Sequence, residues 1–96
     1  MPLTVRRLNS FLKDFKVLRP EEQVKAGKAL RLLIENPRHP SLPVKRIQGT
    51  PNIWEARVDL KHRITFEWEN ALLVLRRIGS HDIIDKEAKS GAKRSG

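Results

Sequence analysis

The stretch that decides the fold, residues 54–68, reads Trp-Glu-Ala-Arg-Val-Asp-Leu-Lys-His-Arg-Ile-Thr-Phe-Glu-Trp. Apolar and polar residues alternate through residues 54–60 and again through residues 63–68, with a short polar break between the two runs. Alternation with a period of two predicts strands with one face on a core and the other face in water. Such a short break makes the two strands antiparallel neighbours. Arg57 and Arg63 would then project from the water-exposed face of one sheet, which we interpret as a cationic working surface.

Two helices are predicted before this hairpin. Apolar residues at positions 8, 11, 12, 15 and 18 have the spacing of one helix face. Pro20, followed by Glu21 and Glu22, is typical of the first turn of a second helix. The short link between the two predicts a helix hairpin on the back of the sheet, where Gly27 would allow a close approach. We expect the apolar stripe of the second helix to consist of Val24, Gly27, Leu30, Leu33 and Ile34.

The remaining segments complete an α+β arrangement, with helices followed by a run of antiparallel strands. Residues 3–7 form a first strand or a lead-in, and residues 36–43 form a stiff loop with three prolines. Residues 44–48 and 71–78 read as further strands, the latter with a nearly continuous apolar start. We therefore expect one domain over residues 1–85, an N-terminal helix hairpin packed on a small antiparallel sheet. Residues 86–96 lack large apolar side chains and are expected to form a basic, disordered tail.

Charge is the most informative property of the composition. The 96 residues include 20 Lys and Arg against 11 Asp and Glu, which gives a formal net charge of +9. So large an excess favours a polyanionic partner, because basic surfaces gain affinity for phosphate backbones by releasing counterions. The absence of cysteine excludes disulfides and thiolate metal sites and fits a cytoplasmic location. No apolar run is long enough to span a membrane, and three well-separated histidines predict neither a metal site nor a cofactor.

His81 and the basic side chains of the strands are the candidate site residues. His81 follows a strand directly and lies beside Asp82, at the kind of strand end where site residues are often presented. Arginine forks match phosphate geometry and can stabilise charge on a phosphorane. A solvated sheet face with cross-strand ion pairs is the alternative, and the hairpin carboxylates are expected to pair with facing Arg and Lys. Besides Arg57 and Arg63, the candidates for binding a polyphosphate are Lys45, Arg46, Lys61, Arg76 and Arg77, and Asp82 is a further candidate substrate-site residue.

The order of several short motifs resembles a known family. The motifs are Phe-Leu-Lys-Asp-Phe-Lys-Val-Leu at 11–18, Lys-Arg-Ile-Gln-Gly at 45–49, Ile-Trp-Glu-Ala-Arg-Val at 53–58, His-Arg-Ile-Thr-Phe at 62–66 and Ile-Gly-Ser-His at 78–81. Together they resemble the RelE/ParE toxin superfamily over residues 3–85, with the YafQ-like and YoeB-like branches favoured. The resemblance implies a microbial-RNase-like α+β fold and the toxin role in a type II toxin–antitoxin module, held inactive by a cognate antitoxin.

The resemblance also implies a mechanism. Most members of the family cut mRNA on the ribosome without a metal and so inhibit translation. Carried over to this chain, Arg57 and Arg63 would hold the scissile phosphate and His81 would be the general acid. Lys45 and Arg46 fall where site residues occur, and Asp82 could orient His81.

Two departures from the family keep other functions open. Gln48 stands where the family usually has a lysine, and the chain has no tyrosine to stack on a substrate base. One alternative is a ParE-like toxin that inhibits DNA gyrase without nuclease activity. Another is a small basic RNA-binding protein.

Overall fold

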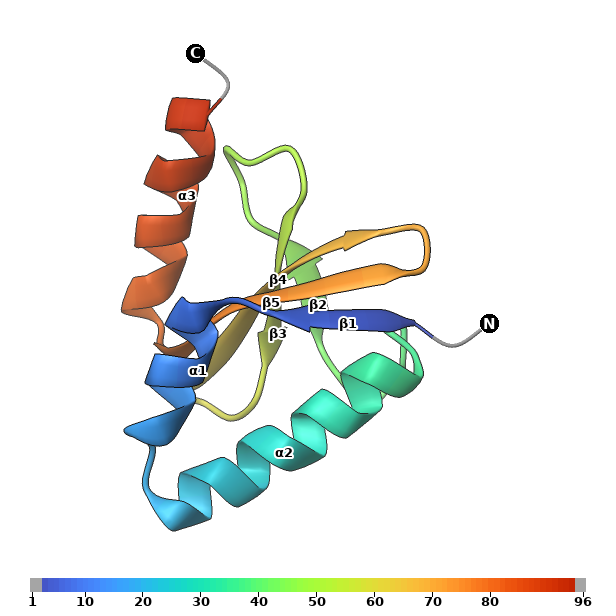
Figure 1. Ribbon diagram of the computed structural model, residues 1–96, viewed down its shortest axis with the longest axis vertical. Coiled ribbons are helices and arrows are strands. Elements are labelled where there is room, and N and C mark those ends of the chain that lie inside the picture. The colour runs from blue at the N-terminus through green and yellow to red at the C-terminus, as the bar shows by residue number, and fades with distance from the viewer. Residues whose placement is uncertain (1–2, 95–96) are drawn as a thin grey trace.

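A five-stranded mixed sheet with three helices forms the structure (Figure 1). The computed structural model describes residues 3–94, and the side chains of residues 3–89. The sheet order is β1-β5-β4-β3-β2, in which β1 is parallel to β5 and the other neighbours are antiparallel. The elements are β1 (Thr4–Arg7), α1 (Asn9–Lys16), α2 (Pro20–Glu35), β2 (Val44–Arg46), β3 (Ile53–Arg57), β4 (His62–Glu69), β5 (Leu72–Ser80) and α3 (Asp82–Arg94). The predicted α+β class, with two helices before a mostly antiparallel sheet, is confirmed.

The core lies between one face of the sheet and the helices α1 and α2. Ala56, Ile64 and Ile78 are direct register partners on β3, β4 and β5, and all three are buried. Phe11 of α1 and Leu33 of α2 are buried in the same cluster. The alternation therefore predicted the core face correctly within β3 and β4, whereas Leu60, which has the same parity as Ala56, is 86% exposed.

Helix α1 also protects the edge of β5. Strand β1 pairs with β5 only as far as Leu75, so the rest of that edge has no strand partner. The Ser10 hydroxyl donates to the carbonyl oxygen of Arg76 at 2.6 Å, and the Asp14 carboxylate accepts from the N–H of Ile78 at 3.1 Å. Asp14 also accepts two hydrogen bonds from Arg77. Side chains of one helix thus satisfy backbone groups that would otherwise form an open sheet edge.

The apolar stripe of α2 differs from the prediction. Ala26, Ala29 and Leu33 are buried, whereas Val24 is 73% exposed. A Cβ atom built at Gly27 would meet nothing within 4 Å, so no close approach requires glycine there. Two small alanines let α2 lie near the sheet, which apolar spacing alone does not reveal.

The second face of the sheet is the main correction to the sequence analysis. Helix α3 contacts β3, β4 and β5, and it covers side chains that were expected in water. Thr65 is fully buried and Glu55 and Arg63 are 7% and 8% exposed, so this stretch of the face is a buried polar layer. Arg57, which lies at the end of β3, remains exposed.

The sequence analysis expected a disordered tail from residue 86, but α3 continues to Arg94. Residues 95 and 96 lie outside the described part. Buried Glu87 accepts a hydrogen bond from Arg76 Nε at 2.7 Å, and Arg76 also pairs with Glu67. These contacts anchor α3, whose apolar contact with the sheet includes buried Ile83. The domain therefore extends beyond residue 85. Within residues 3–94, none of the helices has the length and apolar character needed to cross a bilayer.

Replacing Gly27 with alanine should raise the free energy of unfolding by about 0.5–1 kcal/mol, because the site is open and helical. Gly49→Ala is the control and should lower stability, since Gly49 has φ of +85°. Chemical denaturation measures both variants. A destabilised Gly27→Ala protein would contradict the geometry of α2.

Replacing Glu87 with alanine should lower the free energy of unfolding by about 2 kcal/mol. This is below the roughly 3–5 kcal/mol for breaking a fully buried ion pair, because Glu67 still contacts Arg76. The control is Glu69→Ala, which removes an exposed carboxylate at the end of β4 and should have little effect. Equal stability of the Glu87 and Glu69 variants would show that α3 is not anchored by this pair.

Candidate active-site pocket

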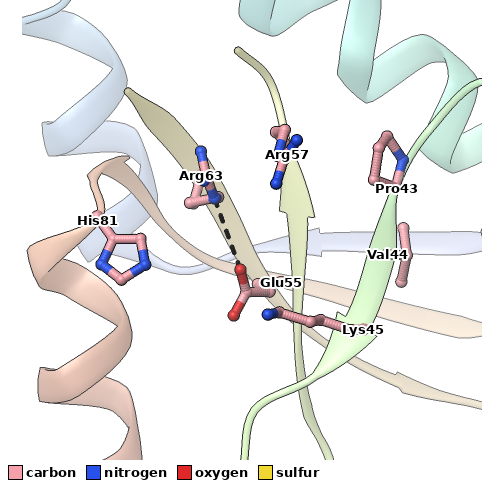
Figure 2. Close-up of a pocket in the computed structure, with 7 residues that line it drawn as sticks. All are labelled: Pro43, Val44, Lys45, Glu55, Arg57, Arg63 and His81. Carbon is pink, nitrogen blue, oxygen red and sulfur yellow. Dashed lines mark ion pairs between the residues drawn. The ribbon is translucent and has the colours of Figure 1, made fainter. Parts of the chain in front are cut away.

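A pocket of about 300 Å³ opens between β2, β3, β4 and the segment joining β5 to α3. Figure 2 shows His81 on one side and Lys45 on the other, with Arg63 and Glu55 between them. Arg57 lies beside Arg63 at the end of the neighbouring strand. The pocket therefore combines cationic groups, an imidazole and one carboxylate.

Two arginines face each other across the β3–β4 ladder. Arg57 and Arg63 are direct register partners, an arrangement in which like charges repel. Arg63 is held by hydrogen bonds from Nη1 to the carbonyl oxygens of Asp59 at 2.7 Å and His62 at 3.1 Å. Its Nε also lies 3.6 Å from Glu55 Oε1. Among residues 3–89, no carboxylate forms an ion pair with Arg57, so one guanidinium is fixed and the other is available to an anion.

The other pocket residues follow from sheet register and chain order. Lys45 of β2 is the register partner of Glu55 on β3, so their side chains share a face of the sheet. His81 lies between β5 and α3, and its carbonyl oxygen accepts the N–H of Ile84 at 3.1 Å. The His81 side chain is exposed and lines the pocket. An exposed imidazole near two guanidinium groups has the right chemistry for proton transfer beside a bound phosphate.

The structure brings together half of the predicted site residues. Lys45, Arg57, Arg63 and His81 line the pocket, whereas Arg46, Lys61, Arg76 and Asp82 do not. Arg46 follows Lys45 on a strand and points to the opposite face, Lys61 lies in the β3–β4 turn, and Asp82 is exposed at the start of α3. Arg76 is held by Glu87 and Glu67, and its hydrogen bonds to these carboxylates raise the pKa of its guanidinium despite burial.

Glu55 is the pocket residue that sequence reasoning did not select. The carboxylates of the hairpin were expected to be neutralised by facing basic residues, and Glu55 does contact Arg63. It nevertheless lines the pocket between Lys45 and His81. Its parity with Arg57 in the alternating stretch was the available signal, because same-parity residues of a strand share a face.

The turn before β4 has its own network, centred on Asp59. One carboxylate oxygen of Asp59 accepts from the backbone N–H groups of Lys61 at 2.8 Å and His62 at 2.7 Å. The His62 ring lies between Asp59, at 3.0 Å from Nδ1, and Glu22 of α2, at 3.1 Å from Nε2. His62 begins β4 and joins this turn to α2. The network holds the carbonyl groups that bind Arg63.

A metal site finds no support within the described residues. No group of three or more His, Cys, Asp or Glu side chains there is arranged to hold an ion.

Comparison with known proteins identifies the fold. No family model and no curated protein sequence matches the chain. Among solved structures, a chain of the Escherichia coli DinJ–YafQ toxin–antitoxin complex superposes with a TM-score of 0.71 at 21% identity, covering 86% of this chain and 97% of that one. The Methanococcus jannaschii RelB–RelE antitoxin–toxin complex gives 0.68 at 19% identity over 85% and 96%. The YoeB/ParE toxin from Agrobacterium tumefaciens gives 0.71 at 14% identity over 82% and 99%. The chain thus has the fold of the RelE, YafQ and YoeB toxins.

Replacing Asp59 with asparagine should make the free energy of unfolding less dependent on pH. Burial raises the pKa of the Asp59 carboxyl, but hydrogen bonds from Lys61 and His62 outweigh it, so the pKa lies below 3.8. A carboxyl with a lowered pKa stabilises the fold above its unfolded pKa and loses this contribution as pH falls through the folded value. The difference in free energy of unfolding between wild type and Asp59→Asn should therefore be larger at about pH 5 than at about pH 2. Denaturant titrations at both pH values check this, and an equal difference would contradict it.

Proposed function

We propose that this chain, which has the fold of the RelE, YafQ and YoeB toxins, is the toxin of a type II toxin–antitoxin pair and cleaves mRNA on the ribosome in the cytoplasm. One observation carries the proposal: His81 lines the same small pocket as two facing arginines and a carboxylate. Such a set can bind a phosphodiester and move protons on both sides of it.

The arginines bind and neutralise the scissile phosphate in this proposal. Arg57, exposed and without an ion-pair partner among residues 3–89, contacts the non-bridging oxygens first. Arg63 is already fixed by backbone carbonyl groups, so it needs little reorganisation as charge develops on the phosphorus. Lys45 adds a third positive charge from β2. Fixed donors aimed at developing charge stabilise a transition state more than flexible ones.

His81 and Glu55 supply the acid and the base. The 2′-hydroxyl oxygen of a ribose attacks the adjacent phosphorus as Glu55 accepts the hydroxyl proton. The bond from phosphorus to the 5′-oxygen breaks, and His81 donates a proton to that oxygen. The products are a 2′,3′-cyclic phosphate and a 5′-hydroxyl end. All of these transfers use side chains that line the pocket.

A cognate antitoxin is the proposed protein partner. The net charge of +9 favours an acidic chain, because complementary charge steers association and suppresses wrong partners. The superposed YafQ and RelE structures are of complexes with the antitoxins DinJ and RelB. We expect the antitoxin to cover the pocket or its surroundings and so to keep the toxin inactive.

Replacing His81 with alanine should reduce RNA cleavage by about 10²–10⁴-fold, the usual contribution of a general acid. Lys45→Ala should reduce cleavage by about 10–100-fold, since a hydrogen bond to a charged group contributes about 1.5–3 kcal/mol. The matched control is Arg46→Ala, which removes the same charge from the next residue on the opposite face. The measurement is growth arrest with mapping of mRNA 5′ ends after expression in cells.

Equal arrest by wild type and His81→Ala, without new mRNA ends, would exclude the nuclease mechanism. Inhibition of gyrase supercoiling under those conditions would instead establish the alternative toxin function. If none of the proteins arrested growth, the remaining alternative would be a small RNA-binding protein that is not a toxin.

A further inference from the structure

A second cavity adjoins the first across Arg57. It has a volume of about 360 Å³ and lies between α2, the loop before β2 and the end of β3. Arg57 lines both cavities. Because this side chain is exposed, its guanidinium donors can serve a ligand that passes from one cavity to the other. The two cavities therefore share one cation, Arg57.

The second cavity has an apolar floor and a basic rim. The floor is formed by Ala29 and Leu42, which are buried, and by half-buried Leu32 and Val58. The rim includes Lys28 of α2, which is exposed and forms no ion pair within residues 3–89. A flat apolar base fits such a floor, while a phosphate fits the rim.

The acidic residue of this cavity, Asp59, does little to repel an anion. Its carboxylate already accepts hydrogen bonds from Lys61 and His62. It also lies 3.8 Å from the ammonium group of Lys25, another lining residue. The charge of Asp59 is thus largely compensated, and the free positive charge on Lys28 and Arg57 dominates the cavity.

We propose that the second cavity is a subsite for the nucleotide adjacent to the cleaved bond in single-stranded RNA. The base lies on the apolar floor, and the next phosphate along the strand is bound between Arg57 and Lys28. This inference rests on the proposed function, because it extends the same RNA strand from the pocket of His81. The shared Arg57 favours a continuous polyanion over a separate protein segment as the ligand.

Binding of uncleavable oligonucleotides tests the subsite in the full-length chain. The probes are fluorescent 2′-O-methyl RNA of two and of four nucleotides, since the single phosphodiester of the shorter one occupies the first pocket and leaves no phosphate for Lys28. Wild type should bind the longer probe at least about tenfold more tightly. Lys28→Glu should abolish most of this gain and change the affinity for the shorter probe less than about twofold. In a plot of log affinity against log salt concentration, Lys28→Ala should also reduce the magnitude of the slope for the longer probe by about 0.7.

Lys16→Glu is the matched control, because Lys16 is an exposed lysine on α1 outside both cavities. An equal loss in Lys16→Glu and Lys28→Glu would overturn the subsite, as would an equal loss for both probe lengths. A peptide of alternating Glu and Leu residues provides the competing ligand. If Lys28→Glu weakens only the peptide, the cavity binds protein and the inference fails. Failure of the nuclease proposal is distinguishable, because it removes cleavage without removing the length-dependent binding.

Discussion

The pairing of Arg57 with Arg63 is the constraint around which the site is built. Two guanidinium groups in register on neighbouring strands repel each other, so they are expected to lie in different environments. Glu55 and two backbone carbonyl groups fix Arg63 in a buried position, whereas Arg57 stays exposed. The sheet therefore presents one preorganised cation and one adaptable cation at the same place. Lys45 and His81 join them because β2 pairs with β3 and because β5 ends beside β4.

The turn between β3 and β4 supports this arrangement from outside the pocket. Asp59 organises the turn through its carboxylate, while its carbonyl oxygen binds Arg63. His62 connects the turn to Glu22 near the start of α2. Residues outside the pocket of His81 thus determine where its cationic group can lie, as expected of supporting contacts around a preorganised site.

Local patterns predicted the fold well and the site only in part. Alternation in residues 54–68 located the core face of β3 and β4, because Ala56 and Ile64 are register partners and pack in one row with Ile78 of β5. The covering of the opposite face could not be predicted from apolar spacing, since α3 is anchored by an ion pair between Glu87 and Arg76 as well as by Ile83. The same contact explains why Arg76, a candidate by charge, is absent from the pocket. Residues next to each other on a strand face opposite ways, so predicting Lys45 and Arg46 together guaranteed that one would lie elsewhere.

Because His81 lies immediately before α3, the geometry of the pocket is coupled to the folding of that helix. The His81 carbonyl oxygen accepts the N–H of Ile84 in the first turn of α3, so opening of that turn would release the segment that carries the imidazole. A single helix can open locally at a lower free energy than global unfolding. The pocket would then lose the proton donor of the proposed mechanism while the sheet remained folded. If the proposed mechanism holds, activity would therefore be lost on heating at a lower temperature than the fold of the sheet.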